Sequence, residues 1–490
     1  MFKYMDMKII YNFCHCSLIV GVLFAVFAFE SCTKLVEVDV PTDRIVDRNV
    51  YTNDETAIAV LNGIYINMSQ PGTFTGTRSI SLFAGLSADE LALYDGIGGV
   101  HLNYYQNELS VTDGTGSEHW TPLYSYVFKC NAAIEGLQSA TSLNPAVRQQ
   151  LLGEAKFLRA FQYFYLVTMF GDVPIVLSTD YSVNERLARS PKEVVFKQII
   201  ADLEEAKSLL STNYLDRSLQ PYTGETERVR PTRWAAAALL ARAYLYKGDY
   251  ANAETQADLV INNAAMYDLT PINDVFLKNS LEAIWQLQPV TFGHNTEDGF
   301  VFVLPDSGPG IDENKGFYIS NELLNNFEMG DQRKETGNWI NNVTVDGITY
   351  YYPYKYKISE LDAPVSEYLM VLRLGELYLI RAEARAQLNN ISGAQGDLNR
   401  IRTRAGLPNI NAIDKVSLLS AILHERQVEL FTEWGHRWLD LKRTGNVDKV
   451  MSIVTPLKAN GNIWRSFQQW YPLPFSDIQK GPNLVQNAGY

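Results

Sequence analysis

The sequence predicts a mainly α-helical protein, in which tetratricopeptide-like helical hairpins pack with a loop-rich helical subdomain carrying a few short strands. Three observations predict this fold class. Apolar residues recur at helical spacing through most of the chain, one segment has tetratricopeptide spacing, and two stretches rich in Gly, Asp and Tyr interrupt the helices. With 46% apolar and 20% charged residues, the 490-residue chain has the composition of a folded protein.

Residues 1–31 have the pattern of an export signal and are left out of the predicted fold. The uncharged run 18–29 suits the apolar part of a signal peptide, but it is shorter than the roughly 20 residues of a membrane-spanning helix. Cys32 follows a small residue after this run, as in a bacterial lipobox, although Phe29 and Glu30 are unusual there. We expect cleavage before Cys32 and lipid attachment to its sulfur; the alternative is an ordinary secretory signal with an incidental cysteine.

The first helices are predicted from apolar faces and a capping pattern. Residues 54–68 place apolar side chains on one face, and 120–137 with 151–168 form a candidate hairpin. The next helix begins near Ser190, whose side chain is expected to cap it, with Glu193 completing a capping box.

The clearest supersecondary signal lies at 233–261. Small residues there let two helices approach closely, Gly248 and Asp249 make the turn, and Ala253 is expected to pack back on the first helix. The segment 374–401 is a weaker candidate of the same kind. Because these units are unevenly spaced, we favour helical pairs interrupted by insertions over a regular solenoid; ordinary helical hairpins with small residues at their crossings are the alternative.

Two insertions break the helical pattern. The first is 70–119 and the second is 262–365, which contains a strand-like alternation at 282–289 and a Tyr-rich run at 349–357. Loops held by a rigid scaffold are where binding sites usually occur. We therefore expect ligand contacts in these two insertions.

Charge, hydropathy and cysteine content exclude several classes of protein. The formal net charge of −13, without any basic block, makes nucleic acid a poor partner. The N-terminal run is the only long apolar stretch, which argues against a polytopic membrane protein. Once the signal is lost and Cys32 is lipidated, Cys130 is the remaining thiol, so we expect no internal disulfide and a buried Cys130.

No motif of catalysis is present: the sequence lacks a Gly-x-Ser-x-Gly elbow, a Walker A loop, a dinucleotide fingerprint, HExxH and paired Cys-x-x-Cys. One acidic cluster places Glu425, Glu429 and Glu433 on a helical face, interleaved with Arg426 and Arg437. Arginine forks bind carboxylates in bidentate pairs, which favours a structural ion-pair network over a metal or acid–base site. We therefore predict no catalytic residue, no metal site and no cofactor.

Several long motifs, in the same order, resemble the SusD/RagB family of outer-membrane lipoproteins. The resemblance begins at Cys32 and covers most of the mature chain. Its most specific segments are 153–176, 372–388, 398–407, 425–445 and 471–490. It implies four parts of the chain: a lipoprotein signal at 1–31, an N-terminal region at 32–230, a tetratricopeptide-like hairpin at 231–270 and a C-terminal region at 271–490.

The resemblance also implies a function. Members are non-enzymatic proteins, anchored by lipid to the outer face of the outer membrane, that capture oligosaccharides and deliver them to a SusC-like TonB-dependent transporter. A peptide or another nutrient with the same transporter is the alternative ligand. A hydrolase with an unrecognised carboxylate pair, and a helical adaptor that binds only protein, are the alternatives from other classes.

Sugars have apolar C–H faces, which aromatic rings can cover, and hydroxyl groups at their edges, which polar side chains can bind. We therefore choose aromatic and polar residues of the two insertions as candidate ligand contacts. The candidates are Tyr94, Asp95, His101, Asn103, Tyr104 and Tyr105 in loop 94–108, and Phe292, His294, Asn295, Phe317 and Tyr318 in loop 291–318. Trp339 and 350–352 are weaker candidates, and for each aromatic the alternative is packing within its own loop. Trp285, Trp434 and Trp438 are predicted to be packing residues.

Overall fold

The computed structural model describes residues 48–490 except 413 and 459–461, so the signal segment and Cys32 lie outside the described residues. The helices are α2 Asp54–Ser69, α3 Ile80–Ser87, α4 Gly99–Gln106, α5 Trp120–Ser139, α6 Pro145–Phe170, α7 Tyr181–Asn184, α8 Lys192–Leu209, α9 Arg233–Lys247, α10 Tyr250–Ile261, α11 Glu297–Phe302, α12 Asn321–Leu324, α13 Leu374–Gln387, α14 Ile391–Arg404, α15 Lys415–Glu429, α16 His436–Arg443, α17 Val447–Val454 and α18 Phe475–Lys480. The strands are β1 Leu91–Leu93, β2 Ala283–Leu287, β3 Phe317–Ile319, β4 Ile340–Val345, β5 Ile348–Pro353 and β6 Leu369–Arg373.

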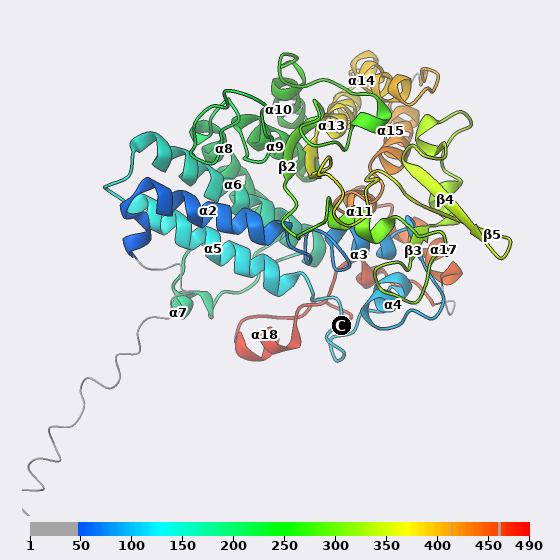
Figure 1. The fold of residues 1–490 in the computed structure, drawn as a ribbon. Coiled ribbons are helices and arrows are strands. Elements are labelled where there is room, and N and C mark those ends of the chain that lie inside the picture. The colour runs from blue at the N-terminus through cyan, green and yellow to red at the C-terminus, as the bar shows by residue number, and fades with distance from the viewer. Residues whose placement is uncertain (1–47, 413, 459–461) are drawn as a thin grey trace, which may run out of the picture. The chain divides into compact units, whose positions relative to one another are not determined.

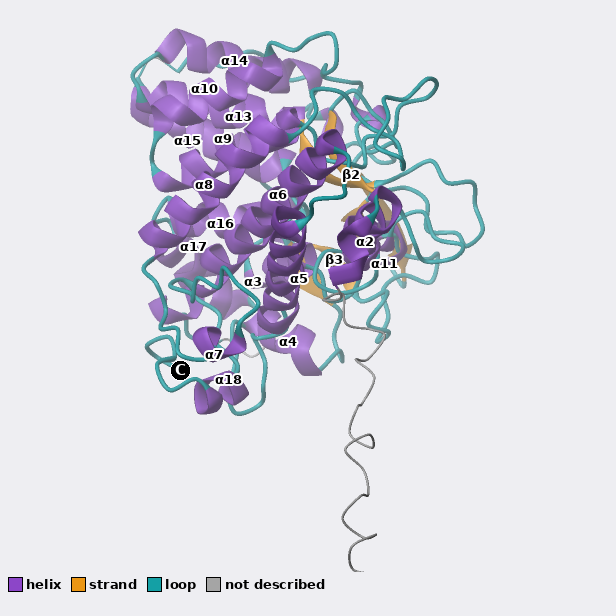
Figure 2. Ribbon diagram, turned by 90° about the vertical axis from the view of Figure 1, so that its left-hand side faces the viewer, coloured by secondary structure: helices purple, strands orange, loops and turns teal. Residues whose placement is uncertain are grey.

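The predicted fold class is confirmed: the described chain is mainly helical, and its strands form two-stranded antiparallel sheets that pair β1 with β3, β2 with β6 and β4 with β5. The helices α5, α6, α8, α9, α10, α13 and α14 form a row in which each contacts the next (Figure 1). Figure 2 shows most helices gathered on one side and most strands and long loops on the other, with α2 and α11 beside the strands. The helical row is therefore a scaffold for a loop-rich face.

The predicted hairpin at 233–261 consists of α9 and α10. Gly248 ends α9 with a φ of 77°, and the Asp249 side chain accepts a hydrogen bond from the Asn252 backbone amide to begin α10. Ala253 is fully buried, so the second helix lies close to the first. The other predicted pairs, α5 with α6 and α13 with α14, are also confirmed.

The predicted cap of α8 is wrong. The helix begins at Lys192, with Pro191 at the N-cap and no side-chain cap hydrogen bond. Ser190 instead pairs through its backbone with Val173. The Oδ1 atom of Asp172 accepts a hydrogen bond from the Lys192 amide at 3.0 Å, so a neighbouring loop caps the helix in place of Ser190.

The first insertion is less loop-rich than predicted. It contains α3, β1 and α4, so residues 99–106 of the expected loop 94–108 are helical. Gly98 precedes α4 without a side-chain cap, and Asn107 ends it in the left-handed region with a φ of 58°. The candidates from His101 to Tyr105 therefore lie on a helix, where only one face is open to solvent.

A continuous apolar core runs beneath the helices. The Phe161 ring lies 5.5 Å from both Trp285 and Trp434, which join α6 to β2 and to the segment before α16. Trp438 and Cys130 are also buried, as predicted. Residues 48–490 form one compact unit around this core. Of the helices that the structure describes, each is too short or too polar to cross a membrane.

Candidate functional site

Strand alternation places one predicted aromatic residue inside and the next outside. In the antiparallel pair β1–β3, Leu93 lies opposite Phe317 and Ala92 lies opposite Tyr318. Phe317 is fully buried, whereas Tyr318 is half-buried. Because neighbouring side chains of a strand point to opposite faces, a buried Phe317 directs Tyr318 toward the surface.

Three half-buried tyrosines meet at this surface, and we call Tyr94, Tyr318 and Tyr350 the tyrosine cluster. The Tyr318 and Tyr350 rings pack edge to face with centroids 5.2 Å apart, and the Tyr94 and Tyr350 rings do so at 6.2 Å. Burial, followed by the neighbouring phenols and Asp95, raises the pKa of Tyr318, so its hydroxyl stays protonated at neutral pH. Edge-to-face packing fixes the rings, and a phenol hydroxyl can both donate and accept hydrogen bonds.

A cavity of about 160 Å³ adjoins the cluster, with Tyr318 shared between them and Tyr105 on another wall. Its polar floor is Lys458, whose Nζ donates to the Leu86 and Ser87 carbonyls at 2.7 and 3.0 Å. Burial lowers the pKa of Lys458 to about 7. The two hydrogen bonds to backbone carbonyls therefore hold the Lys458 side chain in place before a ligand binds.

Four of the predicted candidates lie in the core, where three of them bond other parts of the protein through a polar atom, while the Nδ1 atom of His101 is buried without a hydrogen-bond partner. Tyr104 stacks on Phe83 with centroids 4.1 Å apart, and its hydroxyl donates to Glu118 at 2.6 Å. His101 bonds the Thr77 carbonyl through Nε2 at 2.8 Å. Asn295 Oδ1 accepts from the amides of Ser366 and Glu367, and Phe317 is fully buried. These side chains hold the insertions in place and lie away from solvent.

The remaining candidates lie outside the core and are not members of the tyrosine cluster. Asp95 is exposed, and the Asn103 amide donates to Thr115 Oγ1 at 3.3 Å. Phe292 is 94% exposed, and His294 next to it bonds Glu297 at 3.1 Å. Of the weaker candidates, Trp339 is fully buried beneath Lys355, Arg373 and Arg404, so it is a core residue.

The acidic face of α15 belongs to an ion-pair network, as predicted, but its partners differ from those expected. Glu429 bonds Arg373 at 2.6 Å and Arg333 at 2.8 Å, and both arginines come from other segments. The interleaved arginines bind other carboxylates: Arg426 pairs with Asp440 at 2.6 Å and Arg437 pairs with Asp89 at 2.7 Å. Within the described residues, no group of three or more His, Cys, Asp or Glu side chains is arranged to hold a metal ion.

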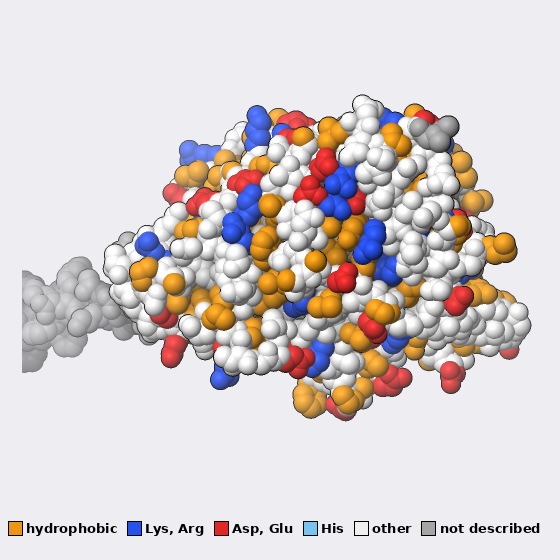
Figure 3. All heavy atoms as spheres, turned by 90° about the horizontal axis from the view of Figure 1, so that it is seen from above, with side chains coloured by type: hydrophobic (Ala, Val, Ile, Leu, Met, Phe, Trp, Pro, Cys, Tyr) orange, Lys and Arg blue, Asp and Glu red, His pale blue; other side chains and the backbone are white. Residues whose placement is uncertain are grey.

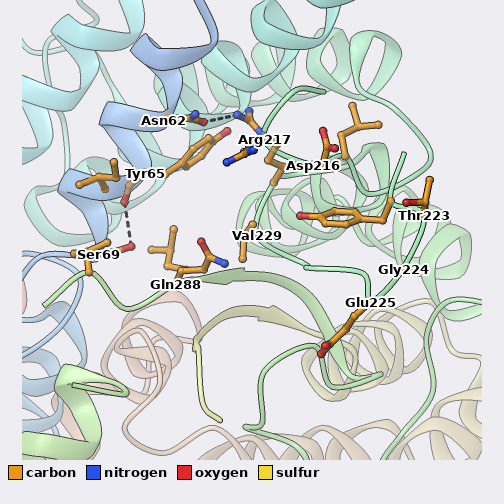
Figure 4. A pocket seen from close by; sticks show the side chains of 16 residues that line it. Asn62, Tyr65, Ser69, Asp216, Arg217, Thr223, Gly224, Glu225, Val229 and Gln288 are labelled. Atoms are coloured by element: carbon orange, nitrogen blue, oxygen red, sulfur yellow. Dashed lines mark hydrogen bonds between the residues drawn. The ribbon is translucent and has the colours of Figure 1, made fainter. Parts of the chain in front are cut away.

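A second, larger cavity of about 670 Å³ was not anticipated from the sequence (Figure 4). It lies between α2, the turn 215–225 and the end of β2, and none of its lining residues is among the predicted candidates. Figure 4 shows Tyr65 reaching into it from α2, with Asp216 and Arg217 across the space and Gln288 below. The Tyr-Thr-Gly segment at 222–224 is the feature of the sequence that could have indicated this cavity. Its partners on α2 are far away in the sequence, so the segment alone does not predict a site.

Two family profiles match this chain. The SusD family profile matches residues 307–490, and the profile described as starch-binding associating with outer membrane matches residues 59–245. Together they cover more than half of the chain. These matches place the chain in an outer-membrane-associated, glycan-binding class of protein, which is non-catalytic. The chain belongs to the SusD/RagB family.

Curated relatives and solved structures agree with this family. SusD-like protein P25 of Formosa agariphila is 23% identical over 96% of this chain and 99% of its own length. Starch-binding protein SusD of Bacteroides thetaiotaomicron is 25% identical over 73% of this chain and 74% of its own length.

Two solved structures have the same fold. A SusD-like protein from Bacteroides fragilis has a TM-score of 0.74 at 22% identity, and the match covers 92% of this chain and all of that one. A laminarin-binding SusD-like protein has a TM-score of 0.69 at 23% identity and covers 90% of this chain and all of that one.

Proposed function

We propose that this protein captures oligosaccharides at the tyrosine cluster and the adjoining cavity and delivers them to a SusC-like TonB-dependent transporter. The observation that carries the proposal is the position of Tyr94, Tyr318 and Tyr350. Three rings from different elements meet at one half-buried surface, beside a polar cavity that shares Tyr318.

The chemistry of this surface suits a sugar. Ring faces cover apolar C–H groups, and the tyrosine hydroxyls supply both donors and acceptors for the hydroxyl groups of a sugar. Lys458, in the floor of the cavity, already donates hydrogen bonds within the protein. A sugar can therefore bind there with little rearrangement of the protein. Such a site is suited to binding and release, and nothing in the proposal requires bond cleavage.

The names of two relatives indicate which ligands to test first. One curated relative is named as starch-binding, and one solved structure is described as laminarin-binding. We therefore choose maltoheptaose and laminarihexaose, an α-glucan and a β-glucan, as the first probes for this chain.

The site is tested by removing two rings together. The double variant Tyr94→Ala/Tyr318→Ala is expected to weaken binding of a recognised oligosaccharide at least tenfold in calorimetry, since each lost ring removes on the order of 1 kcal/mol of stacking. Tyr181→Ala is the matched control, because that ring is 78% exposed on α7, outside both cavities. An unchanged Kd in a double variant with native circular dichroism would exclude the cluster as the site.

Membrane anchoring and the transporter form the second part of the proposal. Lipid attachment at Cys32 keeps the protein at the outer membrane, where a TonB-dependent transporter is within reach. Full-length protein is expected in the outer-membrane fraction, and Cys32→Ala is expected to release it. Affinity purification of the full-length protein from solubilised outer membranes should recover a SusC-like transporter; recovery without any such transporter would contradict the delivery step.

A further inference from the structure

The 670 Å³ cavity has the size and composition of a second binding site. Its volume falls within the range of about 300–1,000 Å³ that is typical of small-molecule sites. Two half-buried tyrosines line it from different elements, Tyr65 on α2 and Tyr222 on the turn 215–225. It shares no residue with the tyrosine cluster or with the cavity beside that cluster.

A buried hydrogen-bond network fixes the α2 side of this cavity. The Tyr65 hydroxyl donates to Glu154 at 2.7 Å, and Arg230 donates twice to the same carboxylate at 3.0 and 2.7 Å. Arg230 also bonds Asn62. Glu154 is fully buried and Arg230 is 4% exposed, so the Tyr65 ring is held in one position before a ligand binds.

The opposite wall is a tight turn with little freedom. Leu215 and Pro221 form an antiparallel bridge, and the Asp216 amide donates to the Gln220 carbonyl at 2.8 Å. Asp216 Oδ1 accepts from the Gln220 amide at 3.0 Å and so closes the turn from its side chain. These bonds hold the Tyr222 end of the turn against the cavity.

The charges that line this cavity nearly cancel. Asp216 and Glu225 are negative, whereas Arg217 and Arg230 are positive. Arg230 is already paired with Glu154, which leaves one positive and two negative side chains in the lining, and Glu225 accepts a bond from Asn279 at 3.4 Å. The small negative excess disfavours an anionic ligand and suits an uncharged ligand rich in hydroxyl groups.

We propose that this cavity is a second oligosaccharide-binding site, which binds an uncharged sugar segment between Tyr65 and Tyr222, with Gln288 and Arg217 available to its hydroxyl groups. The inference rests on the proposed function, because it assumes that the protein binds glycans. The cavity is separate from the tyrosine cluster, so loss of one site leaves the other intact.

Calorimetry with maltoheptaose and laminarihexaose tests the proposal in the Tyr94→Ala/Tyr318→Ala background. Residual binding is expected there, and adding Tyr222→Ala is expected to weaken it about tenfold or more. Tyr222→Ala is chosen because it leaves the network of Tyr65, Glu154 and Arg230 unchanged. Gln288→Ala provides a second variant. It removes the hydrogen bond that the Gln288 side chain donates to the Tyr368 hydroxyl at 3.2 Å.

Hydrogen exchange of the unaltered protein gives an independent readout. Saturating ligand is expected to protect amides in 59–69 and 215–225 as well as near β1 and β3. Protection confined to β1 and β3, with unchanged affinity in Tyr222→Ala, would overturn this inference and leave the proposed function standing. Absence of binding to any glycan would remove the proposed function itself. Preferential binding of a charged alginate hexamer in this cavity would contradict the proposal that its ligand is an uncharged sugar.

Discussion

Single residues hold this fold together through charges that are buried and paired. Arg242 and Glu376 form a bidentate pair with bonds of 2.8 and 2.6 Å, and both side chains are nearly inaccessible. Breaking such a pair is costly, because it leaves one charge buried without a partner. The pair of Arg242 and Glu376 therefore ties α9 to α13 within the scaffold.

The first prediction at this scale concerns acid. Burial alone raises the pKa of Glu376, but Arg242 and the other nearby cations outweigh it and lower that pKa to about 2. Since the folded pKa lies below the ordinary value of 4.5, ionised Glu376 adds stability above pH 4.5 and loses it as the pH falls toward 2. Glu376→Gln should lower the free energy of unfolding by about 3 kcal/mol at pH 7 and flatten the acid dependence between these values.

Urea unfolding at a series of pH values measures both effects. Glu185→Gln is the matched control, because Glu185 is exposed and its pair with Arg186 at 3.8 Å lies at the surface. Its stability should change by less than about 0.5 kcal/mol. Equal acid dependence in Glu376→Gln and the unaltered protein would show that the pair does not contribute as described.

The second prediction concerns Gly435, which begins α16 with a φ of 71°. A Cβ atom here would lie 2.7 Å from the Cβ of Ala84, and the backbone conformation is one that other residues adopt at a cost. Gly435→Ala should lower the free energy of unfolding by about 2 kcal/mol or more. Gly396→Ala on α14 is the control, because nothing lies within 4 Å of its added Cβ; equal effects of the two variants would contradict the prediction.

Among the elements, the helical hairpins depend on small residues at their crossings. Ala253 is fully buried in α10, whereas Ala251 on the same helix is exposed. Ala253→Leu should separate α10 from α9 and lower the free energy of unfolding by about 1–3 kcal/mol. Ala251→Leu adds the same atoms in solvent and should change it by less than about 0.5 kcal/mol, so thermal unfolding of the two variants tests the packing directly.

The elements also show what local sequence could predict. The hairpin at 233–261 carries its turn, its small residues and its periodicity within one segment, so it was predicted correctly. The cap of α8 was not, because Asp172 reaches Lys192 from an adjacent loop and Ser190 is used in a backbone bridge. Helix α4 was missed because its sequence, Gly99–Gln106, begins with a glycine and has no clear apolar face.

The candidate site was predictable only in part, since its partners come together through the fold. Strand alternation separates Tyr318 from Phe317, but which of the two is buried depends on the pairing register of β1 and β3, which the sequence alone does not reveal. Tyr350 joins Tyr94 and Tyr318 only because β5 lies beside β3. The larger cavity needs α2, the turn 215–225 and the end of β2, which lie far apart in the chain.

At the scale of the whole molecule, the described residues 48–490 share one core, so the proposed regions 32–230, 231–270 and 271–490 remain a division by sequence. On the face seen in Figure 3, acidic and basic side chains are scattered among uncharged ones. Neither sign of charge is gathered into one large patch on that face, and the chain as a whole has a net charge of −13, which suits a neutral ligand better than a polyanion.

The most direct measurement is calorimetry of the lipid-free form 33–490, which retains the whole described unit, with maltoheptaose and laminarihexaose, followed by chromatography of the recovered sugar. We predict saturable binding of at least one oligosaccharide, which is recovered at its original length after prolonged incubation. Shortened products would contradict a binding protein without catalysis. Binding of peptides, together with no affinity for these two oligosaccharides or for a wider panel of neutral glycans, would contradict the proposal that the ligand is a glycan.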